Sequence, residues 1–158
     1  MKTRVGMGYD VHQLTEGRDL WLGGIKIEHS HGLLGHSDAD VLIHAICDAL
    51  LGAANMRDIG YHFPDTAEET DGIDSKILLR KTIDLIAKKG YKVGNIDCTV
   101  CAEKPKLNPY VEDMKKCLST VMGTDIDDIS IKATTTERLG FTGRMEGISA
   151  YCVALIEK

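Results

Sequence analysis

The sequence predicts an α+β protein, a two-layer α/β sandwich in which helices cover one face of a mixed β-sheet. Stretches with the alternating or continuous apolar pattern of strands occur near both ends of the chain. Segments of helical period with capping residues at their ends lie between them. The predicted order is β-β-α-α-β-α-β-β, and one layer of helices on one sheet is the simplest way to pack it.

The first third of the chain predicts two strand regions and a helix. Residues 4–11 have strand character, and residues 20–27 form a second strand region with a double glycine as its turn or bulge. A loop rich in glycine and histidine follows over residues 28–36. Ser37 has a typical N-cap side chain, so we expect a helix from there to about Leu51, where a glycine follows.

The middle of the chain predicts a second helix and a strand. A loop over residues 53–72 separates the first helix from the second. Asp74 or Ser75 is expected to cap that second helix, which ends near Gly90. The strand covers residues 92–102.

The last third predicts a helix followed by two strands. Asn108 precedes a proline and is expected to cap a helix that ends at Gly123. Residues 129–133 form a short strand, and a polar loop leads to the last strand over residues 148–156. Both alternating series of that strand are largely apolar, so its outer face needs a partner and we expect an oligomer.

Composition bounds the class of protein. The 158 residues fit one domain, residues 1–158, with 43% hydrophobic residues and a net charge of −5 that argues against nucleic-acid binding. We find no apolar run long enough to cross a membrane and no signal or transit peptide, so we expect a cytoplasmic protein. Five cysteines, an odd number, suggest reduced thiols. Cys98 and Cys101 should face opposite sides of a strand and cannot chelate one ion.

Three residues suggest a metal site. Asp10 and His12 are two apart at the end of a strand, so both side chains leave the same face. His44 can add a third ligand from the first helix, with Asp40 one turn earlier to support it. Two nitrogens and one oxygen suit zinc with an open fourth position. A solvated His44 and a turn-capping Asp10 are the structural alternative.

Three loops carry groups suited to an anionic ligand. His36 and Ser37 open a helix, whose N-terminus favours anions. Residues 134–136 are three threonines, followed by Glu137, which can bind a hard cation, and later by Arg144, which can bind phosphate. Residues 102–108 join a strand to a helix and can contact a nucleobase through their backbone. Each loop is ordinary when taken alone.

Together these segments resemble the 2-C-methyl-D-erythritol 2,4-cyclodiphosphate synthases of the non-mevalonate isoprenoid pathway. The resemblance covers essentially the whole chain, and its longest string is highly specific. The matching strings are G-Y-D-V-H at 8–12, G-H-S-D-A-D at 35–40, H-A at 44–45, D-I-G at 58–60, F-P-D at 63–65, A-E-K-P-K-L at 102–107 and A-T-T-T-E-R-L-G-F-T-G-R at 133–144.

The resemblance implies an activity and an assembly. The substrate would be 4-diphosphocytidyl-2-C-methyl-D-erythritol 2-phosphate, whose 2-phosphate attacks the β-phosphate to give the cyclic diphosphate and release CMP. The family works as a homotrimer with active sites between subunits and sheets packed around the trimer axis. Its cofactors are Zn²⁺ and a second ion, Mg²⁺ or Mn²⁺.

The resemblance also implies the site residues. The zinc ligands are Asp10, His12 and His44, and Glu137 binds the second ion. His36 and Thr135 match catalytic positions that stabilise the transition state. The substrate-binding residues are His36, Ser37, Asp58, Ile59, Gly60, Phe63, Asp65, Phe141 and Arg144. The cytidine and diphosphate residues are Ala102, Lys104, Pro105, Lys106, Leu107, Asn108, Ala133, Thr134, Thr135, Thr136 and Glu137.

One departure and two rival functions remain. Some relatives pair the arginine at position 144 with an acidic residue where this chain has Tyr151, so we do not expect that ion pair here. A zinc phosphohydrolase would use the same ligands and differ only in its product. A non-catalytic cytidine-binding module would need neither metal nor turnover.

Overall fold

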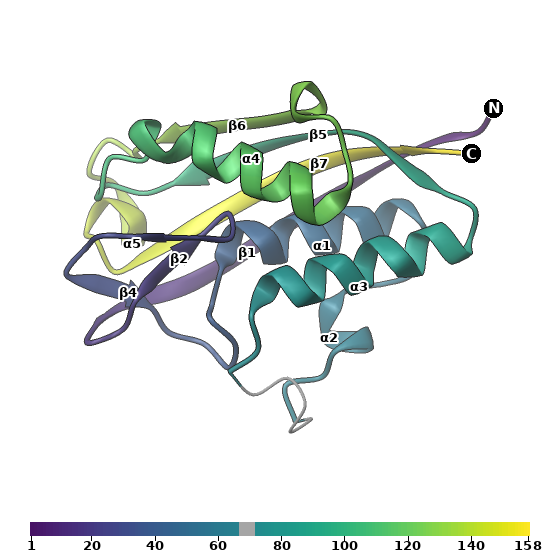
Figure 1. The fold of residues 1–158 in the computed structure, drawn as a ribbon. Coiled ribbons are helices and arrows are strands. Elements are labelled where there is room, and N and C mark those ends of the chain that lie inside the picture. Colours follow the sequence, from purple (N-terminus) through teal and green to yellow (C-terminus); the bar gives the residue numbers. More distant parts are fainter. Residues whose placement is uncertain (67–71) are drawn as a thin grey trace.

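A five-stranded mixed sheet forms one layer of the protein (Figure 1), seen in a computed structural model that describes residues 1–66 and 72–158. Its strand order is β4-β1-β7-β5-β6, and β2 pairs with β3 in a separate hairpin. The strands are β1 (Thr3–Glu16), β2 (Leu20–Leu22), β3 (Ile25–Ile27), β4 (His31–Leu33), β5 (Lys92–Cys101), β6 (Ile129–Thr134) and β7 (Gly147–Glu157).

Helices form the second layer, with α1, α3 and α4 gathered on one side of the sheet in Figure 1. The aliphatic core lies between the layers. The helices are α1 (Val41–Ala53), α2 (Ile59–His62), α3 (Ser75–Lys88), α4 (Val111–Met122) and α5 (Gly140–Gly143), with 3₁₀ turns η2 (Asn108–Tyr110) and η3 (Ile126–Asp128). The predicted fold class, a two-layer sandwich with helices on one face of a mixed sheet, is confirmed.

The one parallel pairing brings two predicted loops together. β5 and β6 run parallel, whereas the other neighbours in the sheet are antiparallel. Parallel strands end at the same edge of a sheet, so the segments after β5 and β6 lie side by side. The backbone N–H of Ala102 donates to the carbonyl of Thr134 at 2.9 Å. The expected cytidine residues are therefore neighbours in space.

Helix α1 lies directly on β1, at the strand that carries Asp10 and His12. Two glycines of β1 make this close approach possible. A Cβ built on Gly8 would stand 1.9 Å from the carbonyl oxygen of Ala45, and one built on Gly6 would stand 2.1 Å from that of Ala49. The helix backbone thus touches the strand backbone, which brings His44 close to the end of β1.

The opposite face of the sheet is apolar and exposed. Residues of β1 and β7 that point away from the helices pair across the strands, and the rings of Tyr9 and Tyr151 lie 4.9 Å apart. This outer β1/β7 face consists of Val5, Met7, Tyr9, Val11, Tyr151 and Val153, each between 42% and 67% exposed. The inward series of β7 is fully buried. The apolar pattern predicted for both faces of the last strand is confirmed.

Two starts of elements differ from prediction. Helix α1 begins at Val41 with Asp40 as its N-cap, so the prediction of Ser37 as cap is wrong. Ala39 has a φ of 58°, which keeps the chain out of helix before that point. Asn108 lies within the 3₁₀ turn η2 rather than capping α4, which runs on from that turn and ends, as predicted, at Gly123.

Several short or extended elements also differ. β1 continues to Glu16, well past the predicted end at Val11, because it pairs with β7 and then with β4. Among the described residues, β4, α2 and α5 lie in predicted loops. Part of the loop predicted over 53–72, residues 67–71, lies outside the described residues. The second helix has Asp74 as its N-cap, as predicted.

The five cysteines are free thiols. Cys98 is buried and Cys101 half-buried on β5, as expected for opposite faces of one strand. In the part of the chain that the structure describes, no helix is both long enough and apolar enough to cross a membrane.

Candidate functional site

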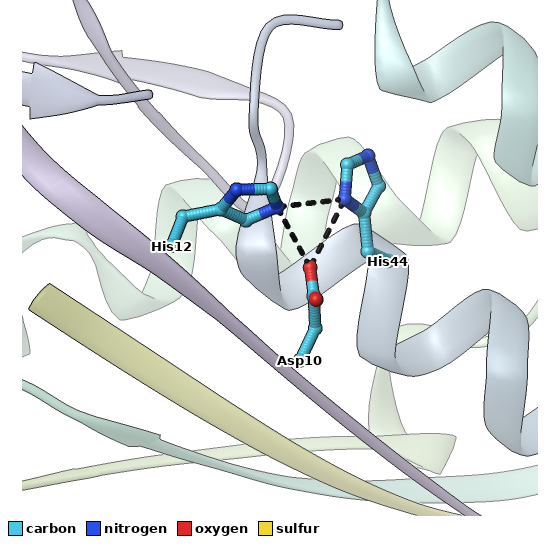
Figure 2. A group of neighbouring side chains, drawn as sticks. All are labelled: Asp10, His12 and His44. Carbon is cyan, nitrogen blue, oxygen red and sulfur yellow. Dashed lines mark hydrogen bonds and ion pairs between the residues drawn. The ribbon is translucent and has the colours of Figure 1, made fainter. Parts of the chain in front are cut away.

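The side chains of Asp10, His12 and His44 converge where β1 passes α1 (Figure 2). Asp10 Oδ2 lies 2.9 Å from His12 Nε2 and 3.1 Å from His44 Nδ1. The two ring nitrogens are 3.3 Å apart. One oxygen and two nitrogens thus form a triangle of potential ligand atoms, as the sequence predicted. Within the described ranges, these three side chains form a group that could hold a metal ion.

The electrostatics of this triangle favour an ionised carboxylate. Burial by itself would raise the pKa of Asp10, but hydrogen bonds and charge from His12 and His44 outweigh it and hold that pKa at about 2. Burial would lower the pKa of His12, whereas its hydrogen bond to Asp10 and the carboxylate charge raise it above the ordinary value. The triangle therefore favours positive charge beside an ionised Asp10.

The residues fit zinc. Ligand atoms about 2.0–2.1 Å from a tetrahedral zinc ion lie about 3.3 Å from one another, close to the separations seen here. Two imidazoles and one carboxylate are a typical donor set for zinc with a fourth position left open. The ring of His12 is also oriented correctly, because its Nδ1 must donate to the carbonyl of Leu34 at 2.8 Å and leaves Nε2 free to bind metal.

The predicted supporting role of Asp40 is not what the structure shows. Its fully buried carboxylate accepts from the backbone N–H groups of Ile43, Gly23 and Gly24 at 2.8–3.0 Å. Burial raises the pKa of this carboxyl despite these donors. Asp40 therefore ties the β2–β3 hairpin to the start of α1. Its contact with His44 is a backbone one, since the N–H of His44 donates to the carbonyl of Asp40 at 3.0 Å.

A cavity of about 180 Å³ opens onto the metal donors. His36 and Ser37 lie on its wall, at the segment that precedes α1. The loop around α2 forms another wall. The predicted site residues that line this cavity are Asp10, His12, His36, Ser37, His44, Ile59, Gly60, Phe63 and Asp65. Most of the predicted substrate residues therefore share one cavity with the metal donors.

Asp58 lies just outside that lining, where it organises the loop. Its Oδ1 accepts from the backbone N–H of Tyr61 at 3.0 Å and caps α2. Asp48 of α1 anchors the same loop by accepting from the N–H of Ile59 at 2.8 Å. Burial raises the pKa of Asp48. The sequence analysis did not identify Asp48 as an anchor of this loop.

A second cavity of about 370 Å³ lies at the ends of β5 and β6. The predicted cytidine residues in its wall are Ala102, Pro105, Lys106, Leu107, Asn108, Ala133, Thr134 and Thr135. His36 and Thr135, the two residues matched to transition-state stabilisation, thus line different cavities of the single chain.

The loop beside this second cavity is held by Glu103. Its Oε1 accepts from the backbone N–H groups of Thr136 at 2.9 Å and Arg138 at 3.3 Å. Glu137 and Arg138 have positive φ values of 54° and 65°, a conformation that non-glycine residues adopt at a cost. Glu103 therefore stabilises a strained loop that carries Glu137. The sequence offered only a charged residue in a charged loop as its signal.

The remaining predicted residues are dispersed. Glu137 is exposed. Among the described residues, it does not belong to a group of side chains arranged to hold a metal ion. Phe141 lines a third cavity of about 680 Å³ that also touches His12. Arg144 pairs with Glu146 through two contacts of 3.2 and 3.3 Å. Its acidic partner is therefore Glu146, whereas position 151 is a tyrosine.

Comparisons with known proteins match this architecture. The chain is 73% identical over its whole length to 99% of a 2-C-methyl-D-erythritol 2,4-cyclodiphosphate synthase from Bacteroides thetaiotaomicron. It is 63% identical to the synthase of that name from Porphyromonas gingivalis, covering 97% of this chain and 94% of the relative.

Solved structures agree with the curated relatives. A structure of 2C-methyl-D-erythritol-2,4-cyclodiphosphate synthase superposes with a TM-score of 0.90 at 35% identity, over 98% of this chain and 100% of that one. An IspF–CDP complex from Plasmodium falciparum has a TM-score of 0.86 at 38% identity, over 98% and 95%. The model of the YgbB family matches residues 3–157. The resemblance seen in the sequence is confirmed, and the chain belongs to the YgbB family.

Proposed function

We propose that this protein converts 4-diphosphocytidyl-2-C-methyl-D-erythritol 2-phosphate into 2-C-methyl-D-erythritol 2,4-cyclodiphosphate and CMP. It would act as a phosphorus–oxygen lyase in non-mevalonate isoprenoid precursor biosynthesis. Residues 1–158 would form a single cyclodiphosphate synthase domain. The cytoplasm is the proposed location, in keeping with the free thiols. The observation that carries the proposal is the cavity that Asp10, His12 and His44 share with His36, Ser37 and the α2 loop.

The reaction needs positioning more than covalent help. The 2-phosphate must approach the β-phosphorus in line while CMP departs, and charge on the phosphoryl oxygens must be neutralised. His36 and Ser37 would bind the attacking phosphate from the wall of the first cavity. Ile59 and Gly60 would hold the methylerythritol through their backbone, which Asp48 anchors. The tethered phosphate thereby becomes the nearest nucleophile.

Two divalent ions would complete the site. Asp10, His12 and His44 would hold zinc, and Glu137 would hold Mg²⁺ or Mn²⁺ near the diphosphate. Bound there, these ions neutralise phosphate charge and polarise the reacting phosphoryl group. Thr135 would donate a hydrogen bond to the departing CMP phosphate.

The nucleotide would occupy the second cavity. Its wall includes the threonines Thr134 and Thr135 and the side chain of Lys106, which suits a cytidine joined to a diphosphate. Because this cavity and the metal cavity are separate in one chain, we propose that the active site forms between subunits. The homotrimer expected from the sequence would bring the first cavity of one copy to the second cavity of its neighbour.

The outer β1/β7 face supports such an assembly. An apolar surface built from six side chains on two long strands is costly to leave in water. Sedimentation velocity is expected to give a species of three times the 17.3 kDa chain mass. Val153→Asp, at the middle of the face, should dissociate it, whereas Lys132→Asp on the edge strand β6 should not. A stable monomer of the unaltered protein at micromolar concentration would contradict the trimer.

Glu103 gives a test of the nucleotide cavity. Glu103→Ala removes the acceptor for two backbone N–H groups in the strained loop, and hydrogen bonds to charged groups contribute roughly 1.5–3 kcal/mol. Calorimetric titration with CDP should therefore show affinity reduced by about 10-fold or more. Zinc content should not change. Glu112→Ala removes an exposed carboxylate from α4 and serves as the control. Equal CDP affinity in both variants would remove Glu103 from this role.

The direct test of the activity is product analysis. Purified protein, the proposed substrate, zinc and magnesium should give two coupled phosphorus resonances of a cyclic diphosphate in ³¹P NMR. CMP should appear in equal amount. Absence of turnover with intact CDP binding would favour the cytidine-binding module instead.

A further inference from the structure

The ring nitrogen of His44 that points away from the metal donors lies between two hydroxyl groups. Nε2 is 2.9 Å from Ser75 Oγ and 3.2 Å from Ser37 Oγ. If Nδ1 binds a metal, the ring proton must sit on Nε2, and a buried N–H needs an acceptor. A hydroxyl can donate or accept, so the two distances alone do not fix the direction of either hydrogen bond.

Asp38 fixes the direction at Ser75. Its Oδ1 accepts the hydroxyl proton of Ser75, and its Oδ2 accepts from the backbone N–H of Ser75 at 2.9 Å. The backbone N–H of Asp40 also donates to Oδ1, at 3.1 Å. An ionised carboxylate has no proton to give, so the Ser75 hydroxyl must donate to it. The lone pairs of Ser75 Oγ then remain for the Nε2–H of His44.

Burial distinguishes Ser75 from Ser37. Ser75 is fully buried at the start of α3, and the residue His44 is only 6% exposed, so their hydrogen bond is shielded from water. Ser37 is half-buried on the cavity wall, where its Oγ accepts from the backbone N–H of Ala39 at 3.1 Å. The shorter and drier contact of His44 is therefore with Ser75.

We propose that Asp38 and Ser75 form a hydrogen-bonded chain that positions His44 with Nδ1 toward Asp10 and His12. The chain links the segment before α1, the helix α1 and the start of α3. It does for His44 what the carbonyl of Leu34 does for His12, but with a hydroxyl whose direction Asp38 sets. Ser75 and Asp38 are positioning residues, since they act through His44. This inference rests on the proposed metal site.

The unaltered protein provides the first test. In zinc-loaded protein labelled with ¹⁵N-histidine, the Nε2 of His44 should carry the proton, and that proton should exchange slowly with water. His29, half-buried in a loop away from the three candidate metal ligands, provides the reference for faster exchange. A proton on Nδ1 of His44, or an Nε2 proton that exchanges as fast as that of His29, overturns the proposal.

Variants provide the second test, read as zinc affinity in competition with a chromophoric chelator. Loss of an outer partner of a ligating histidine costs about 10–100-fold in metal affinity, so Ser75→Ala should lose that much. Ser37→Ala should lose less. Thr82→Ala removes another fully buried hydroxyl of α3, one that donates to Leu78, and should keep its zinc affinity.

The outcomes distinguish the role of the Asp38–Ser75 hydrogen bonds from the existence of the metal site itself. Equal zinc affinity for Ser75→Ala and the unaltered protein overturns the role of Ser75 and leaves the metal site standing. Failure of the unaltered protein to bind zinc rejects the site and this inference together. If Ser75→Ala does not fold, the exchange measurement on the unaltered protein still decides.

Discussion

His44→Ala is expected to lose nearly all bound zinc and nearly all turnover. The substitution leaves one carboxylate and one imidazole, Asp10 and His12, of a three-donor set whose atoms lie 2.9–3.3 Å apart. Loss of an outer partner already weakens a metal site by about 10–100-fold, so loss of a direct ligand should exceed that range. Atomic absorption on purified protein and ³¹P NMR of the products measure both effects.

His29→Ala is the matched control, because His29 lies in a loop and, among the described residues, its ring packs only against that of His31. That variant should keep about one zinc per chain. CDP should still bind to His44→Ala, since the nucleotide cavity contains none of the three metal donors. Full zinc occupancy in His44→Ala would exclude His44 as a ligand.

Gly8→Ala is expected to damage stability and the metal site together. The added Cβ would stand 1.9 Å from the Ala45 carbonyl oxygen and 2.8 Å from the Ala49 nitrogen, so α1 must move away from β1. Overpacking a core costs typically about 1–3 kcal/mol, and a clash between two backbones belongs at or above the upper end. The shift also separates His44 on α1 from Asp10, two residues after Gly8.

Urea denaturation of the metal-free protein and chelator competition on the loaded protein measure the two losses. Gly52→Ala is the control: it lies within α1, a Cβ there meets nothing within 4 Å, and alanine is favoured over glycine in a helix by roughly 0.5–1 kcal/mol. Its unfolding free energy should stay level or rise. A Gly8→Ala protein with unaltered urea midpoint and zinc affinity would contradict the close packing of α1 on β1.

The sequence could identify Asp10, His12 and His44 as candidate metal ligands because their signals are local. Asp10 and His12 share a strand face by the period of two, and His44 lies in a clear helix. The same reasoning misplaced the start of that helix. Ser37, Asp38 and Asp40 are all capping residues, and the choice of Asp40 depends on the buried N–H groups of a hairpin distant in sequence.

The supporting residues were harder to predict because their partners lie far along the chain. Ser75 meets a histidine 31 residues earlier, and Glu103 meets a loop 33 residues later. In the sequence both have ordinary local interpretations, a helix cap and a charged loop residue. Strand extent follows the same rule, since β1 runs on to Glu16 only because β4 pairs with its end.

The division between cyclisation and hydrolysis depends on which nucleophile reaches the β-phosphorus. A well-oriented tethered nucleophile has an effective molarity of up to about 10⁵–10⁸ M, against about 55 M for water. In the proposed function the 2-phosphate would be held by His36, Ser37 and the α2 loop, and it should therefore react first. The zinc phosphohydrolase differs from the cyclase only in using water at this step.

Turnover in ¹⁸O-enriched water, followed by mass spectrometry of both products, tests this claim most directly. The proposed function predicts no ¹⁸O in the CMP or in the cyclic diphosphate, with one CMP released for each substrate consumed. A linear phosphate product that carries one ¹⁸O atom would contradict it and identify water as the nucleophile.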